Sequence, residues 1–126
     1  MLRDSEVRIL IDFVPRTDRE KLAHVLVALT IGLGLKCTQI RALRPHQVSV
    51  SGGYVMMKDF ILLPEWVWNA VRWYAEIAPV SLSPPPYFIR ETLVINSLHN
   101  IVEAHTERLL GRPVPVLHLR LLHHVQ

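Results

Sequence analysis

The sequence lacks the features that mark several classes of protein. It contains one cysteine, Cys37, so it can form neither an intramolecular disulfide nor a zinc site built from cysteines. Its most apolar stretch, residues 22–35, is shorter than the ~20 residues of a membrane-spanning helix and contains His24. Residues 3–8 carry four charges where a secretory signal would be apolar. We therefore expect a soluble, intracellular protein with no membrane partner.

The length and composition exclude a disordered chain and leave room for one domain. Half of the 126 residues are hydrophobic and a fifth are charged. A domain of this length buries roughly two-thirds of the surface of its unfolded chain, which is enough for a hydrophobic core. We expect residues 1–126 to form a single domain, with Cys37 as a buried structural thiol rather than a nucleophile.

Positive charge exceeds negative charge only slightly. There are 14 Lys and Arg residues against 11 Asp and Glu residues, which gives a net charge of +3. Most of the cations are arginines, whose guanidinium groups favour bidentate contact with phosphates or carboxylates. This balance permits an anionic partner without requiring one. An arginine- and proline-rich composition with few amides is equally typical of a GC-rich or heat-adapted genome.

The pattern of apolar residues predicts helices, interrupted once by a short sheet. Thr17 and Glu20 form a capping box before a helix whose nearly continuous apolar sequence indicates that it is buried, and Gly32 and Gly34 are expected to end it. Alternating side chains around the glycine pair at 52–53 predict an antiparallel meander. The expected fold is a mainly helical α+β domain with a small three-stranded antiparallel sheet. Its helices cover residues 4–14, 18–33, 36–43, 65–78 and 92–110, with the start of another over 117–124; its strands cover 48–50, 54–57 and 60–63, and an extended loop covers 79–86.

Three groups of residues allow both a functional interpretation and a plainer structural one. Residues 34–43 have helix-turn-helix character, although two helices joined at a glycine occur in most helical domains. The seven histidines lack the spacing of a metal site, so we expect no metal and no cofactor, with the histidines exposed or half-buried. The aromatic residues of the 65–78 helix could stack on bases, but their helical spacing favours packing in the core or at a partner interface. These residues are His24, His46, His99, His105, His118, His123 and His124, and Trp66, Trp68, Trp73 and Tyr74.

Several sequence boxes, in order along the chain, resemble the catalytic domain of tyrosine recombinases (phage integrases). Residues 2–7 resemble its LTxEEV opening, and residues 28–48 resemble its TGLRxSELxxLxWxDI box. Lys58 falls in the second turn of the expected meander, where that family has a catalytic lysine. Residues 63–65 match the family's helix entry, and residues 114–122 resemble the start of its HxLRHT box. The resemblance extends over essentially the whole chain and implies the recombinase fold and an origin in a virus or mobile element.

The sequence departs from this family at the positions that carry its chemistry. The first catalytic arginine falls on Lys36 and its neighbouring glutamate on Gln39. The two histidines of the HxLRHT box fall on Leu117 and Leu121, while its arginine is kept as Arg120. Residue 126 comes before the family's last His/Trp box and its nucleophilic tyrosine. Because lysine cannot reproduce the bidentate grip of arginine on a transition-state phosphate, we expect a truncated, catalytically inactive recombinase-like chain.

The sequence therefore predicts a protein that binds double-stranded DNA through a basic face and has no catalytic residues. The expected phosphate contacts are Lys36, Arg41, Arg44, Lys58 and Arg120, of which Lys36, Lys58 and Arg120 occupy vestigial catalytic positions. The alternative is a protein–protein interaction module that keeps the fold without binding DNA. It would pair with a second copy or another protein through the Trp-rich helix or the apolar tail over residues 117–125. Residual phosphodiester cleavage by water, assisted by the three vestigial cations, is a third alternative.

Overall fold

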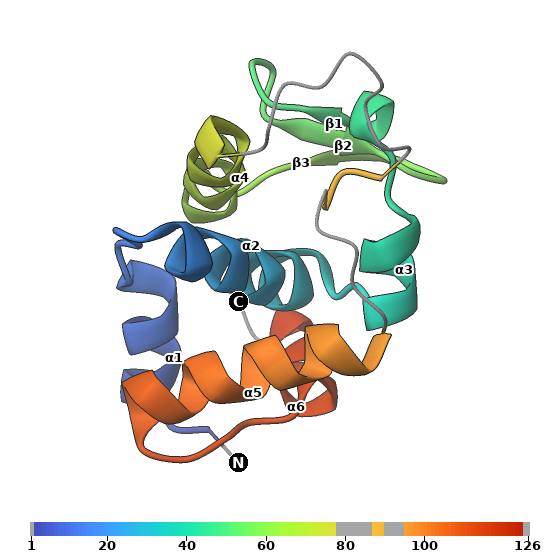
Figure 1. Cartoon of the computed structure of the whole chain (residues 1–126). Coiled ribbons are helices and arrows are strands. Elements are labelled where there is room, and N and C mark those ends of the chain that lie inside the picture. The colour runs from blue at the N-terminus through green and yellow to red at the C-terminus, as the bar shows by residue number, and fades with distance from the viewer. Residues whose placement is uncertain (1, 78–86, 90–94, 125–126) are drawn as a thin grey trace.

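Helix α2 (Asp18–Leu33) occupies the centre of the molecule in this computed structural model, which describes residues 2–77, 87–89 and 95–124. Every residue of α2 from Leu22 onward is buried. The surrounding elements are α1 (Asp4–Asp12), α3 (Cys37–Ala42), η1 (Pro45–Gln47), β1 (Val48–Ser49), β2 (Tyr54–Met56), β3 (Phe60–Leu62), α4 (Glu65–Ile77), α5 (Ile95–Leu110), α6 (Val116–Leu121) and η2 (Leu122–His124). Figure 1 shows the sheet and α4 on one side of α2, and α1, α5 and α6 on the other. This central position explains why α2 is apolar almost all round.

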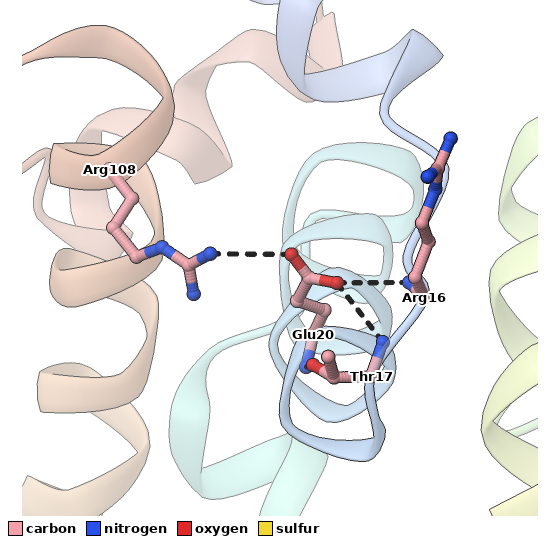
Figure 2. A network of polar contacts seen from close by, with 4 residues as sticks. All are labelled: Arg16, Thr17, Glu20 and Arg108. Atoms are coloured by element: carbon pink, nitrogen blue, oxygen red, sulfur yellow. Dashed lines mark hydrogen bonds and ion pairs between the residues drawn. The ribbon is translucent and has the colours of Figure 1, made fainter.

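The start of α2 is fixed by the capping box that the sequence predicts. The Glu20 backbone N–H donates to Oγ1 of Thr17 at 3.1 Å, and the Glu20 carboxylate accepts the backbone N–H groups of Arg16 and Thr17, each at 3.0 Å. Its second oxygen accepts Arg108 of α5 at 3.3 Å (Figure 2). These bonds, chiefly the one from the Arg16 backbone N–H, hold the pKa of Glu20 below its usual value. The network ties α5 to the N-terminus of α2.

The three strands form an antiparallel sheet in the order β1-β2-β3. Val48 pairs with Val55, and Val55 pairs with Ile61, so these three side chains share one face. Val55 is completely buried on that face. Phe60 and Leu62 of β3 are exposed on the opposite face.

Gly32 lies inside α2 and does not end it, because the helix continues to Leu33 and ends at Gly34. A Cβ atom at Gly32 would lie 2.3 Å from Cγ2 of Val67 in α4. The glycine is therefore needed for the close approach of the two helices, and the expectation that it terminates the helix is wrong.

Replacing Gly32 with alanine should destabilise the protein by about 1–3 kcal/mol, since the added methyl group forces α2 and α4 apart. In most helices the same replacement is stabilising by about 1 kcal/mol, so the sign of the effect is diagnostic. Urea denaturation measures it. In a Val67→Ala background, where Cγ2 is absent, Gly32→Ala should cost nothing further. A Gly32→Ala protein that is more stable than the wild type would contradict this packing.

The aromatic side chains of α4 pack within the molecule. Tyr74 is completely buried. The indole N–H of Trp68 donates to the carbonyl oxygen of Val50 at 2.6 Å, which joins α4 to the turn between β1 and β2. Trp66 and Trp73 are half-buried. These contacts favour the packing interpretation of the helix over base stacking.

Two histidines form a buried cluster that the sequence did not predict. His24 of α2 is 1% exposed and His105 of α5 is 4% exposed, so the expectation of exposed or half-buried histidines is wrong for both. The ring of Phe13 lies edge-on to both imidazoles, at centroid distances of 5.6 and 5.0 Å, and Trp66 and Trp73 approach His24. Nδ1 of His24 and Nε2 of His105 have no hydrogen-bond partner in the described part of the chain. Burial lowers the pKa of each histidine to about 4.

The other predicted elements are confirmed with shifts of a few residues at their ends. Helix α1 ends at Asp12 rather than at residue 14, and α6 begins at Val116 and gives way to η2. The expected loop over residues 79–86 lies outside the described residues, as do residues 92–94 of the expected long helix. No helix within the described ranges is both long and apolar enough to reach across a membrane.

Candidate nucleic-acid interface

The turn between α2 and α3 receives a side chain from near the end of the chain. Gly34 ends α2 with φ of 68°, a left-handed conformation that favours glycine. Nε of Arg120, in α6, donates to the carbonyl oxygen of Gly34 at 3.3 Å. This hydrogen bond brings the guanidinium of Arg120 to the turn that also carries Lys36, two residues after Gly34.

Lys36 is exposed immediately before the first residue of α3. Its backbone N–H donates to Oε1 of Gln39 at 2.8 Å, so Gln39 fixes the start of this helix. Cys37 gives a second sign that Arg120 is close: burial raises the pKa of the thiol, and the positive charge of Arg120 partly offsets the rise. Cys37 is buried, as predicted. Lys36 and Arg120 therefore flank one turn.

His123 supports the same turn and was not among the predicted contacts. Its Nδ1 lies 3.2 Å from the carbonyl oxygen of Ile31, in the last turn of α2. A Cβ atom at Gly34 would lie 3.0 Å from Cδ2 of His123, so the imidazole fills the space that the glycine leaves. The one sequence signal for this residue is its spacing of three from Arg120, which places both on the same side of a helical segment.

Arg41, which is in α3, and Arg44, which follows that helix, have different surroundings. The guanidinium of Arg41 lies over the ring of Tyr87, 4.3 Å from its centroid, and donates to the carbonyl oxygen of Ile89 at 3.5 Å. Arg41 thus ties α3 to the segment 87–89 instead of reaching the turn at Gly34. Arg44 is exposed, and its side chain has no ion pair within the described residues.

Lys58 lies in the turn between β2 and β3, where the sequence places it. Its side chain is exposed, and no carboxylate pairs with it in the described ranges. Figure 1 shows this turn projecting from the sheet on the side of the molecule where α3 lies. No recorded contact among the described residues joins Lys58 to Lys36 or Arg120. Of the five predicted cations, the structure therefore joins Lys36 and Arg120 at one turn and directs Arg41 elsewhere. Within the described residues, Arg44 and Lys58 form no ion pair.

Acidic residues are missing from the segments that carry the five cations, except for Asp59 beside Lys58. Residues 21–58 and 108–126 contain no Asp or Glu. The ion pairs formed within the described residues all involve other cations: Arg8 with Asp12, Lys21 with Glu76, Arg108 with Glu20, and Arg112 with Glu6. Within the described residues, no carboxylate forms an ion pair with Lys36 or Arg120, which favours an anionic ligand at the turn.

Within the described residues, no tyrosine is seen to contact this turn. Among the tyrosines, Tyr74 is buried and Tyr54 and Tyr87 are half-buried in contacts elsewhere. Leu117 and Leu121 are exposed at the positions where the recombinase resemblance has histidines. No group of three potential metal ligands occurs within the described part of the chain.

Neither a known protein family nor a curated protein matches this sequence. Among solved structures, the chain is similar to the crystal structure of XerA recombinase, with a TM-score of 0.76 and 11% sequence identity. The fold is recombinase-like. The similarity covers 97% of this chain and 46% of the XerA chain, so this chain spans about half the length of XerA. The recombinase-like fold that the sequence boxes imply is confirmed. An identity of 11% establishes the fold alone and leaves the activity to be argued from the residues.

Proposed function

We propose that this chain binds double-stranded DNA through phosphate contacts and performs no strand transfer. The observation that carries the proposal is the hydrogen bond from Arg120 to the Gly34 carbonyl, which places Arg120 beside Lys36 on a recombinase-like fold. Two cations from distant parts of the sequence at one turn can hold one phosphate group from two directions. Arg44 and Lys58, which form no ion pair within the described ranges, add positive charge, and Arg41 contributes less because its guanidinium is already engaged.

The absence of strand transfer is proposed from the residues at the turn. Lys36 stands where the resemblance has an arginine, and an ammonium group lacks the planar fork that grips a phosphate with two parallel hydrogen bonds. Leu117 and Leu121 have no group that can donate or accept a proton in phosphodiester cleavage. Phosphate contacts supply affinity and fix the position of the protein on the duplex, but they do not select a base sequence.

The salt dependence of DNA binding tests the proposal. Fluorescence anisotropy with a labelled duplex should show binding at ~50 mM salt that weakens steeply by ~200 mM, since each phosphate contact releases about one counterion. Absence of binding at ~50 mM salt, or an affinity that is independent of salt, would refute DNA binding. A supercoiled plasmid should remain uncut, with Arg120→Ala as the control; nicking that Arg120→Ala abolishes would show residual cleavage.

A further inference from the structure

Two side chains from the C-terminal segment meet the carbonyl end of α2. Arg120 donates from Nε to the carbonyl oxygen of Gly34, and Nδ1 of His123 lies 3.2 Å from the carbonyl oxygen of Ile31. A carbonyl oxygen only accepts, so Nδ1 carries the proton in this contact. Carbonyl groups at the end of an α-helix lack a partner within the helix, and both side chains supply donors there.

The hydrogen bond of Arg120 is not enough to fix its guanidinium. At 3.3 Å it is longer than most such bonds. Within the described residues, Arg120 forms no ion pair and no second hydrogen bond. The completely buried Leu119 anchors α6 in the core, but apolar packing is not directional and does not set the rotation of the helix.

His123 supplies a second, directional contact. It follows Arg120 by three positions, and side chains at this spacing in a helical segment are neighbours. Its ring also packs against Gly34, where a Cβ atom would lie 3.0 Å from Cδ2 of His123. The imidazole therefore opposes rotation of the C-terminal segment both by its hydrogen bond and by its packing.

We infer that His123 is a positioning residue for the phosphate contact of Arg120, an inference that rests on the proposed DNA binding. With Nε held at Gly34, Nη1 and Nη2 of Arg120 have no partner within the described residues, and a guanidinium pairs with two oxygens of one phosphate through such donors. His123 also covers the Ile31 carbonyl. The partial negative charge of the carbonyl end of a helix would otherwise oppose an approaching phosphate.

Duplex binding by variants of His123 tests the inference. Fluorescence anisotropy at ~50 mM salt should show that His123→Ala binds about fivefold more weakly than the wild type. His123→Asn should bind nearly as well as the wild type, because the amide nitrogen of asparagine can take the place of Nδ1. In an Arg120→Ala background, His123→Ala should change the affinity less than ~1.5-fold, since the side chain that it positions is absent.

His118→Ala is the matched control. His118 is exposed on α6 and lies two residues before Arg120, so it is on another side of the helix. Its replacement should leave the affinity unchanged. If His123→Ala folds poorly by circular dichroism, His123→Gln keeps the size of the side chain but displaces the donor, and it should show the same loss of affinity.

A second measurement requires no DNA. The Nε–H proton of Arg120 should give a resolved, slowly exchanging NMR signal in the wild type and in His123→Asn, because it is hydrogen-bonded to a fixed carbonyl. In His123→Ala the same proton should exchange rapidly with solvent. A signal that stays protected in His123→Ala would overturn the inference, since Arg120 would then be held without His123.

The binding data separate this inference from the proposed function. If the wild type binds no duplex, both fail. If the wild type binds and folded His123→Ala binds equally well, this inference alone fails, and His123 only stabilises the fold. An equal loss of affinity on His123→Ala in the wild-type and Arg120→Ala backgrounds would also overturn it, because His123 would then act independently of Arg120.

Discussion

Lowering the pH from 7 to 5 should reduce the free energy of unfolding by about 4 kcal/mol, because His24 and His105 remain buried only in the neutral form. Each has a pKa of about 4 in the folded protein, against an ordinary value of 6.5. The folded state therefore binds fewer protons than the unfolded chain between these values, and at pH 5 each histidine lowers the stability by about 2 kcal/mol. The full stability is present above pH 6.5 and is lost as the pH falls toward 4.

Urea denaturation at several pH values, followed by tryptophan fluorescence, measures this loss, since Trp66 and Trp73 adjoin His24. Glu6 does not contribute to a loss of stability between pH 7 and pH 5. The ion pair and hydrogen bonds of Glu6, first the bond from Arg112, lower its pKa to about 2, so its contribution is lost only below pH 4.5.

Replacing both buried histidines with leucine should flatten the dependence of stability on pH between 7 and 5. The half-exposed His99 provides the control, and His99→Gln should keep the wild-type dependence. A His24→Leu/His105→Leu protein that still loses about 4 kcal/mol would contradict the assignment to these two residues. Equal stability of the wild type at pH 7 and pH 5 would contradict it as well.

Replacing Lys36 or Arg120 with alanine should weaken duplex binding about tenfold each at ~50 mM salt, and replacing both should weaken it about 100-fold. Each replacement would remove a charge-assisted hydrogen bond to phosphate, and the lower end of the range for such bonds, about 1.5 kcal/mol, corresponds to about tenfold in affinity. Arg120→Lys keeps the charge but loses the planar fork, so it should recover part of the affinity. Fluorescence anisotropy with one labelled duplex measures all of these variants.

Arg16→Ala is the matched control for the loss of one positive charge. Arg16 is exposed before the start of α2, close to Glu20 and away from the turn at Gly34. Its replacement should change the affinity less than twofold, because Arg16 and the turn at Gly34 lie at opposite ends of α2 and a charge at that separation is largely screened. If Arg16→Ala weakens binding as much as Arg120→Ala, net charge rather than the turn at Gly34 determines the affinity.

Much of the fold could be predicted from local patterns in the sequence. The capping box of Thr17 and Glu20 set the start of α2, and the apolar run after it indicated burial. The meander followed from alternation around a glycine pair, and its antiparallel pairing is confirmed. These features depend on residues within a few positions of one another, which is why a single sequence was enough to specify them.

Features that depend on contacts between distant elements were missed or misread. Gly32 resembles a helix terminator locally, but its role is set by Val67 of α4. His24 and His105 are polar by type, and only the packing of α2 against α5 with Phe13 makes them a buried pair. No local pattern reports such a contact.

The candidate site was predicted in part. Lys36, Lys58 and Arg120 were chosen through the recombinase resemblance, and the structure brings Lys36 and Arg120 to one turn. Arg41 was chosen for its charge, yet its position on α3 directs it to Tyr87. Arg41 shows that charge and helical position alone do not separate a free cation from one that holds two segments together.

The salt dependence of duplex binding, compared between the wild type and the Lys36→Ala/Arg120→Ala protein, tests the central claim most directly. In a plot of log affinity against log salt concentration, the negative slope becomes shallower by about 0.9 for every phosphate contact removed. We predict that the slope of the double variant is shallower by close to the amount expected for two phosphate contacts. Circular dichroism should show that its fold is unchanged. The same slope and the same affinity in both proteins would show that the turn at Gly34 is not where this recombinase-like chain meets DNA.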